Sequence, residues 1–328
     1  MDTIINVDGV ISDRREAAQK EIGEYLALFK KSFASDEMNI AGITIAADFE
    51  QTVNQLLPEL VKDGYNYTAQ HHSGKAIGKT LRTVNDTGIS FNIVLDGGYL
   101  GGWEDDAKPA RIEIIFHELF HAWLDQKRFS RMGPAGFKND YLTIEGVCYG
   151  LALIRDEYLV DCYLDEVCRH FLTGDGQGPI GLKQLNLARG IDYRDEYLKL
   201  LTDMPGVIDG AVAQGKTGRK SIAEVWHTVH DYVEEILTTF AHLAAGQEKE
   251  PDWQDIQKTI TETPAHQKYL AGHTRVIYTE WVNYFSETYN EAVSLEIIGK
   301  EIREIFHACG LRFKNVPDGI YITLDNTE

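Results

Sequence analysis

Apolar residues recur at two different spacings in the first hundred residues, and these spacings predict which segments are helices and which are strands. Between residues 13 and 33 they recur every three or four positions, which is typical of a helix with one buried face. Residues 43–46 form a short apolar run instead, which favours a strand. Asp48 followed by Gln51 resembles a capping box, so a second helix is expected over residues 49–62.

The segment over residues 76–96 predicts a hairpin. Its two halves, residues 76–84 and 89–95, are rich in strand formers, and the turn-forming sequence Asn-Asp-Thr-Gly separates them. Four glycines then surround Tyr99 and Leu100, so we expect a flexible loop there.

A long helix is expected after this loop. Asp105 and Asp106 precede Pro109, as is common where helices begin, and no Pro or Gly interrupts residues 110–127. The Gly-Pro pair at residues 133–134 predicts that the helix ends just before it.

The rest of the chain is dominated by helical periodicity, and a glycine-rich stretch near residues 174–179 is expected to be a linker. Helices are expected over residues 142–171, 193–201, 205–214, 221–245, 253–270 and 274–308, with a final strand at 320–324. We therefore predict an α+β protein, with a sheet-containing domain over residues 1–175 and a helical bundle over residues 176–328.

The composition is that of an ordinary globular protein and narrows the classes of partner. Of the 328 residues 43% are hydrophobic, and the formal net charge of −19 argues against a general grip on nucleic acid or on an anionic membrane. No apolar run reaches the ~18 residues of a spanning helix, and residues 1–9 do not resemble a signal peptide. The four cysteines form no Cys-x-x-Cys pair, so we expect a cytoplasmic protein with reduced thiols.

The expected long helix contains the sequence His117-Glu118-Leu119-Phe120-His121. Positions four apart on a helix differ by about 40° around its axis, so the two imidazoles leave the same face one turn apart. That arrangement suits two corners of a tetrahedral zinc ion, and Glu118 is placed to take a proton from a water molecule that the metal activates. The same five-residue pattern also occurs by chance, in core helices with two incidental histidines. The apolar residues around it favour the metal interpretation.

A catalytic zinc site usually has three protein ligands, so a third residue is needed. Glu157 stands in an apolar frame, and Asp161 follows it four residues later on the same helix face. We therefore expect Glu157 to bind the metal and Asp161 to accept the outer N–H of a ligand histidine. Glu145 is the competing third ligand, and a residue that the sequence does not identify is a second alternative. A solvent-exposed Glu157 without a role is the third.

These residues resemble a known family. His117-Glu118-x-x-His121 followed by Glu157-x-x-x-Asp161 is similar to the pattern of zincin metallopeptidases of the gluzincin type, in which two helices supply His, His and Glu. The segment over residues 77–93 also resembles small cytosolic zincins of the ImmA/IrrE-like and SprT-like groups. The resemblance implies a zincin-like core, a bound Zn²⁺ and peptide-bond hydrolysis with Glu118 as the general base.

The leading hypothesis is therefore a zinc-dependent peptidase that acts on a peptide or protein substrate. The resemblance implies strand addition by the peptide, which we expect near residues 89–95, with the loop over residues 99–103 as one wall of the cleft. Tyr141, Tyr149 and Tyr158 are candidate oxyanion donors. The alternative is a regulatory or partner-binding protein with a zincin fold, whose activity is latent or absent.

Two further motifs point to other chemistry. Residues 210–217 match the phosphate-loop pattern Gly-x-x-x-x-Gly-Lys-Thr, but no buried strand precedes them, so we interpret Gly215 as a helix C-cap. His227 and His230 lie three residues apart on an expected helix, where surface or core histidines are commoner than a second metal site.

Overall fold

The computed structural model is mixed α+β and divides into two compact units, residues 1–137 and residues 138–328. The described residues are 3–33, 38–57, 67–71, 74–100, 102–103, 108–137, 141–171, 173–174, 178–179 and 181–325. The division falls earlier than the boundary expected at residue 175, because the helices before that residue pack on helices later in the second unit. No helix of the described chain is both long and apolar enough to cross a membrane.

The first unit is built on a four-stranded mixed sheet in the order β1-β2-β6-β5. The strands are β1 (Ile4–Asn6), β2 (Ile40–Ala46), β5 (Gly78–Asn85) and β6 (Gly88–Asp96). β1, β2 and β6 run parallel, and β5 runs antiparallel to β6 in the hairpin that the sequence predicts. β5 is therefore an edge strand of this sheet.

This strand order corrects the expected path of a bound peptide. The segment over residues 89–95 lies in β6, which pairs with β2 on one side and with β5 on the other. Its backbone donors and acceptors are used within the sheet, so a peptide cannot add to it. Among the described strands next to the motif helix, only β5 is at an edge.

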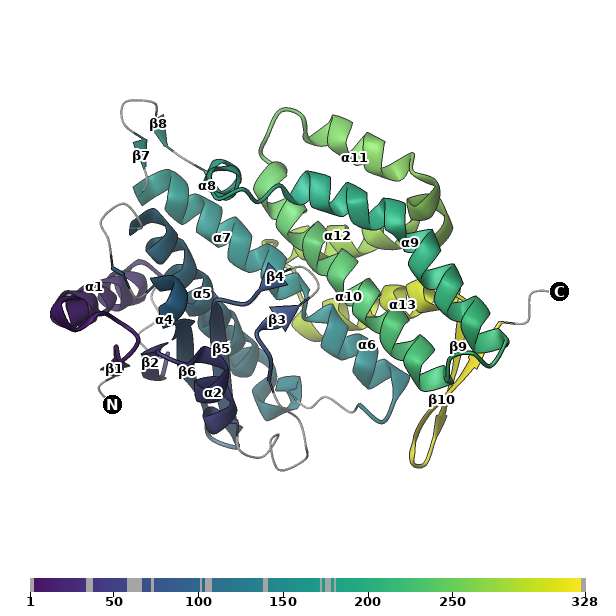
Figure 1. Ribbon diagram of the computed structural model, residues 1–328, viewed down its shortest axis with the longest axis horizontal. Coiled ribbons are helices and arrows are strands. Elements are labelled where there is room, and N and C mark those ends of the chain that lie inside the picture. Colours follow the sequence, from purple (N-terminus) through teal and green to yellow (C-terminus); the bar gives the residue numbers. More distant parts are fainter. Residues whose placement is uncertain are drawn as a thin grey trace. The chain divides into compact units, whose positions relative to one another are not determined.

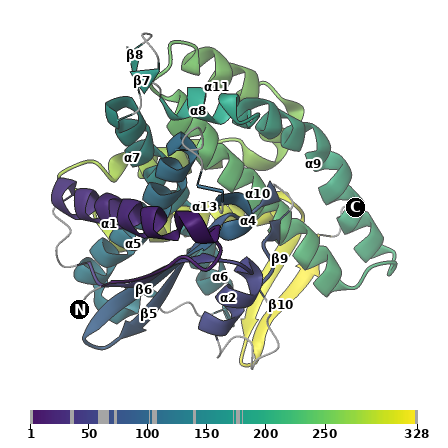
Figure 2. The ribbon, with the colours of Figure 1, turned by 60° about the vertical axis from the view of Figure 1, so that its left-hand side comes forward.

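Helices cover both faces of the sheet (Figure 2). α1 (Arg15–Ser32) packs on α5 (Lys108–Met132), and α5 packs on β5 and β6. On the opposite face α2 (Phe49–Leu56) closes a small core that includes Val53, Leu81 and Val94. α5, which carries the histidine motif, therefore packs on one face of the sheet, and α2 packs on the other.

The shorter elements of the first unit match the predicted boundaries in part. They are η1 (Ser12–Arg14), β3 (Gln70–His71), β4 (Gly74–Lys75), α4 (Gly97–Leu100) and η3 (Gly133–Phe137). Asp48 caps α2 by accepting from the Gln51 N–H, as expected, and α5 stops before Gly133, which has a left-handed φ of 61°. The prediction of a flexible loop is wrong at residues 97–100, which form the helical turn α4. The expected end of α2 at residue 62, and Asp105 and Asp106, lie outside the described residues.

The second unit is mainly helical (Figure 1). Its helices are α6 (Ile144–Ala152), α7 (Arg155–Phe171), α8 (Leu182–Ala188), α9 (Tyr193–Lys216), α10 (Ile222–Gln247), α11 (Trp253–Thr261), a π-helical turn (His266–Leu270), α12 (His273–Asn283) and α13 (Glu291–Ala308). Its strands are β7 (Thr173–Gly174), β8 (Gly178–Pro179), β9 (Leu311–Val316) and β10 (Gly319–Leu324). α10 is central, since α7, α9 and α13 all contact it.

Four predicted helices or helix pairs in this unit differ from the structure. The helix expected over residues 253–270 is divided into α11 and the π-helical turn. The run over residues 142–171 breaks at Leu153 and Ile154, whose N–H groups bond three residues back and so turn the axis between α6 and α7. The run over residues 274–308 likewise breaks before Asn290, which caps α13. Conversely α9 continues through Pro205, because its buried stripe runs on both sides of the proline and packs on α10.

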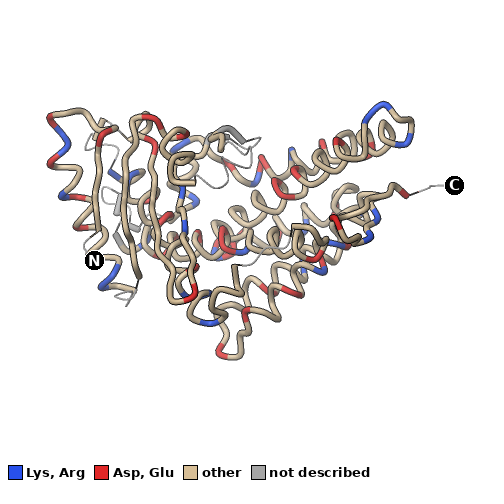
Figure 3. The backbone as a smooth tube through the Cα atoms, turned by 90° about the horizontal axis from the view of Figure 1, so that it is seen from below, with Lys and Arg blue, Asp and Glu red and all other residues tan. Residues whose placement is uncertain are grey.

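The strand expected at residues 320–324 is one half of a hairpin. β10 was expected, but β9 was not, and the two form an antiparallel hairpin from Leu311 to Leu324. In the described chain, basic and acidic positions are interspersed rather than gathered in one basic stripe (Figure 3).

Candidate metal centre

His117 and His121 leave α5 on one face, as their spacing requires, and both are half-buried. Their Nε2 atoms lie 3.1 Å apart, with the ring planes at 70°. Two nitrogens that bind one tetrahedral zinc ion at about 2.0–2.1 Å are about 3.3 Å apart. The two imidazoles therefore have the separation of a ligand pair.

Aromatic packing on the neighbouring face of α5 holds this pair in place. Phe116 and Phe120 precede the two histidines by one position each, and both rings pack edge-to-face on Phe29 of α1, at centroid distances of 5.8 and 5.0 Å. Leu119 is fully buried as well. Because so much of the helix surface is committed to the core, the histidine face has little freedom to rotate.

Glu118 is buried against the edge strand β5 and is only 6% exposed. Thr80 lies against it, with Oγ1 2.7 Å from Glu118 Oε2 and 2.9 Å from the Glu118 carbonyl oxygen. A Cβ atom placed on Gly78 would stand 2.5 Å from Glu118 Oε1, so the carboxylate occupies the space that this glycine leaves open. No Lys or Arg of the described chain forms an ion pair with Glu118.

A second buried acid on the same helix does have cationic partners. Asp125, two turns further along α5, is equally buried, and it is paired with Arg82 at 3.0 Å and with Arg128 at 2.5 Å. A buried carboxylate is costly unless it is paired or well hydrogen-bonded. Of these two buried acids of α5, Asp125 has arginine partners and Glu118 has a hydroxyl partner in the described chain.

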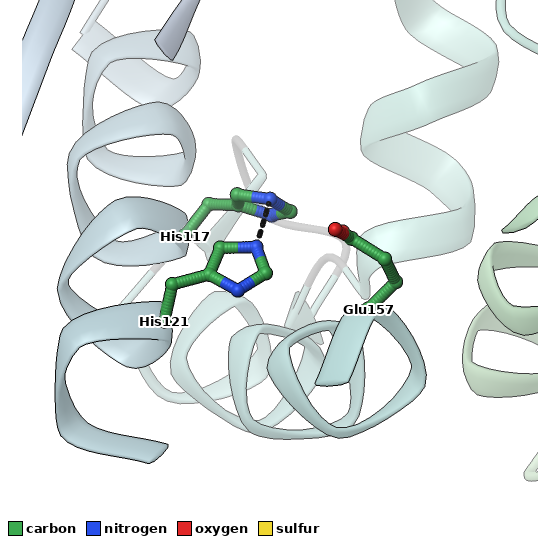
Figure 4. A group of neighbouring side chains, drawn as sticks. All are labelled: His117, His121 and Glu157. Atoms are coloured by element: carbon green, nitrogen blue, oxygen red, sulfur yellow. Dashed lines mark hydrogen bonds between the residues drawn. The ribbon is translucent and has the colours of Figure 1, made fainter. Parts of the chain in front are cut away.

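Glu157 lies near the start of α7 and is half-buried. Figure 4 labels it together with His117 and His121. One ligand atom from each of these three residues can be chosen so that all lie within 4.8 Å of one another. Two imidazoles and one carboxylate are a donor set that suits zinc.

Asp161 is buried one turn after Glu157, and within the second unit its partner is His242. Asp161 Oδ2 lies 2.7 Å from His242 Nδ1, and the His242 ring stacks on Tyr193 at a centroid distance of 4.8 Å. Asp161 does therefore contact an imidazole nitrogen. Its expected contact with a ligand histidine stays a prediction.

Glu145, the competing ligand, has partners of its own within the second unit. Its carboxylate accepts from Arg303 and from Asn315, both at 2.7 Å. The Asn315 hydrogen bond, followed by the effects of the Glu145 backbone and of Arg303, lowers the pKa of this carboxyl group. These contacts give Glu145 a place in the packing of α6, α13 and β9.

Two other predicted features acquire clear local roles. Tyr158 is buried and donates to Glu248 at 2.6 Å, and its burial raises its pKa, so this candidate oxyanion donor is engaged elsewhere. Gly215 lies inside α9, and the left-handed residue after the helix is Gly218, with φ of 70°. The phosphate-loop pattern is therefore helical, and the C-cap glycine was misplaced by three residues.

A second group of metal-ligating side chains occurs on α10. His230, Asp231 and Glu234 offer atoms within 4.8 Å of one another, but the two acids are about half exposed in side-chain area, at 51% and 53%. Such acidic groups on an exposed helix face are ordinary surface features. His230 also stacks on Phe306, which accounts for its position.

Sequence reasoning missed Gly78 and Thr80, although both stand in a segment that it assigned to a strand. Strand alternation puts them on one face, and only the packing of β5 on α5 shows that this face meets Glu118. No known protein family, curated protein or solved structure matches this chain.

Proposed function

We propose that this protein is a zinc-dependent peptidase with a zincin-like core, in which His117, His121 and Glu157 hold the metal and Glu118 is the general base. One observation carries the proposal. Glu118 is a buried carboxylate without a cationic partner in the described chain, and it follows directly on a histidine whose Nε2 lies 3.1 Å from that of the next histidine. The grouping of the three ligand side chains in Figure 4 supports it.

The charge balance favours a cation at this place. Buried acids elsewhere in the chain, such as Asp125 and Glu291, lie against arginine side chains. Glu118 has only the Thr80 hydroxyl in the described chain, so its negative charge lacks such compensation. A divalent ion held by the neighbouring imidazoles would supply the missing positive charge.

The residues then divide the work of hydrolysis. When bound, zinc would lower the pKa of a water ligand and polarise a substrate carbonyl. Glu118 takes the proton from the attacking water and later gives it to the leaving amine, which needs a carboxylate that is placed precisely. His117 and His121 contribute neutral imidazole nitrogens, and α5 fixes them one turn apart.

The edge strand β5 is where an extended peptide would bind. It is the edge strand that carries the contacts to Glu118, through Gly78 and Thr80. A peptide that adds to this edge by main-chain hydrogen bonds would run past the general base without needing a particular side-chain sequence. A peptide or protein is therefore the substrate class that we propose.

Metal content and hydrolysis measured together test the proposal. We expect about one zinc per chain in the wild type, weaker zinc binding in His117→Ala and Glu157→Ala, and full zinc content with abolished cleavage in Glu118→Gln. Activity would be measured against a mixture of unstructured peptides, with products identified by mass spectrometry. Glu145→Ala is the matched control and should retain both metal and activity.

Two outcomes would contradict the proposal, and a third would correct its third metal ligand. A wild-type protein that binds no zinc under conditions where it is folded would remove the metal centre. Zinc binding with peptide cleavage unchanged in Glu118→Gln would remove the assigned base. Full zinc affinity in Glu157→Ala would move the third ligand elsewhere while leaving the two histidines in place.

A further inference from the structure

The face of β5 that packs against α5 carries alternate residues, because side chains of a strand point to its two faces in turn. Gly78 and Thr80 lie against Glu118 on this face, and Arg82 reaches Asp125. Lys79 belongs to the other face, where its Nζ lies 5.8 Å from the centre of the Tyr67 ring. The strand thus places a glycine and a threonine, two positions apart, against Glu118.

Thr80 gives Glu118 a hydroxyl donor next to its carboxylate. Its hydroxyl has one hydrogen and two acceptors within reach, the Glu118 carboxylate at 2.7 Å and the Glu118 carbonyl at 2.9 Å. Both acceptors belong to the same residue. Whichever of them receives the hydrogen, the threonine remains attached to this one position of α5.

Gly78 leaves the space that the other carboxylate oxygen of Glu118 occupies. A Cβ atom at this position would come within 2.5 Å of Oε1 and 2.9 Å of the carboxyl carbon, closer than van der Waals contact allows. A side chain at residue 78 would therefore push the carboxylate of Glu118 away. The backbone φ of Gly78 is not in the left-handed region, so the glycine is needed here for space rather than for conformation.

We propose that Gly78 and Thr80 are the positioning residues of Glu118, one by leaving space and the other by a hydrogen bond. This inference rests on the proposed function, in which Glu118 transfers the proton. A glutamate side chain has several rotatable bonds, and a general base works only from a narrow range of positions. The edge strand fixes that range before substrate binds.

Three variants test the role of Thr80. Thr80→Val removes the hydroxyl at nearly constant volume, and we expect kcat to fall about 10- to 100-fold with KM changed less than about 2-fold. Thr80→Ser keeps the hydroxyl and should recover kcat to within about 3-fold of wild type. Thr202→Val makes the same chemical change at an exposed position of α9, outside the strand proposed to bind the peptide, and should leave kcat unchanged.

Gly78→Ala tests the steric part. The atoms it would displace are the end of a flexible side chain, so the variant should fold with a nearly unchanged melting temperature while kcat falls about 100-fold. Both variants act through Glu118. In the Glu118→Gln background, neither Thr80→Val nor Gly78→Ala should lower the residual rate further.

An infrared measurement separates this inference from the proposed function. The carboxylate stretch of Glu118, isolated at one fixed pH by subtracting the spectrum of Glu118→Gln, should shift in Thr80→Val and return in Thr80→Ser. A shift that returns in this way supports the positioning role even if the wild type cleaves no peptide, in which case only the peptidase proposal fails. An unmoved band, or a further rate loss in the Glu118→Gln background, would overturn the positioning role.

Discussion

Glu118 in the first unit and Glu291 in the second are both buried glutamates, with 6% and 5% of their surface exposed. Glu291 accepts a hydrogen bond of 2.6 Å from the guanidinium of Arg155, which is itself fully buried and also bonds Asp156. Glu118 has one hydroxyl within reach in the described chain. Equal burial therefore accompanies very different charge compensation.

The difference teaches how to separate structural from functional acids. Formation of a buried ion pair costs desolvation free energy, but removal of one partner then leaves an uncompensated buried charge and costs much more. Glu291 therefore has a structural role, as the partner of Arg155. An acid that the fold leaves without a cation is a weak point in stability terms, and such positions are common where a site must bind or react. Five substitutions probe the charge compensation of buried and half-buried groups, from the largest expected effect to the smallest.

Removal of the buried guanidinium of Arg155 should cause the largest loss of stability. Arg155→Met leaves Asp156 and Glu291 buried without their guanidinium, so we expect a loss of about 3–5 kcal/mol in the free energy of unfolding. Urea unfolding followed by circular dichroism measures it. Arg303→Met, which breaks a more exposed pair, is the control, and an equal loss there would refute the special role of burial.

The same substitution at the two glutamates should then give different results. Glu291→Gln weakens the pair with Arg155 and should cost about 2–3 kcal/mol. Glu118→Gln keeps an oxygen for the Thr80 hydroxyl and loses no cation of the described chain, so metal-free protein should change by less than about 1 kcal/mol. Chemical denaturation measures both changes. Equal losses of unfolding free energy in the two variants would contradict the difference in charge compensation on which the site assignment depends.

Lys127 provides the corresponding test with a cation. It lies on α5 over the Trp123 ring at 3.5 Å, and burial, with a smaller contribution from Arg131, lowers its pKa to about 8. The unfolded chain then binds more protons than the folded chain between pH 8 and about 10.5, so this residue makes stability rise with pH across that window. Below pH 8 the penalty is fully present.

Lys127→Met should therefore be more stable than wild type at pH 7. Because the side chain is only half buried, solvent screening should keep the gain near ~0.5 kcal/mol. The gain should shrink as pH rises above 8 and vanish near 10.5 in parallel melting curves. A gain that does not depend on pH would mean that packing on Trp123, rather than charge, is responsible.

Glu145→Ala should have the smallest effect. Its side chain is 59% exposed, and its ion pair with Arg303 lies at the surface, where such pairs contribute about 0.2–1 kcal/mol. We expect a loss near the lower limit and an unchanged zinc content. Loss of zinc in this variant would restore Glu145 as a ligand and would weaken the assignment of Glu157.

Much of the local structure was predictable, because it depends on neighbours in the chain. The hairpin over residues 76–96 and the cap at Asp48 both appear where expected. The errors fall where packing overrides local preference. α9 continues through Pro205 because its apolar stripe meets α10.

For this protein, the residues alone determined that two imidazoles share one helix face, since helical spacing depends only on their separation along the chain. They also determined that Glu118 stands between them. Which strand lies at the sheet edge, and that Gly78 and Thr80 meet Glu118 there, was decided only by tertiary packing. The physical reason is that strand order and the contact of β5 with α5 join residues about 40 positions apart, and no local pattern records such a contact.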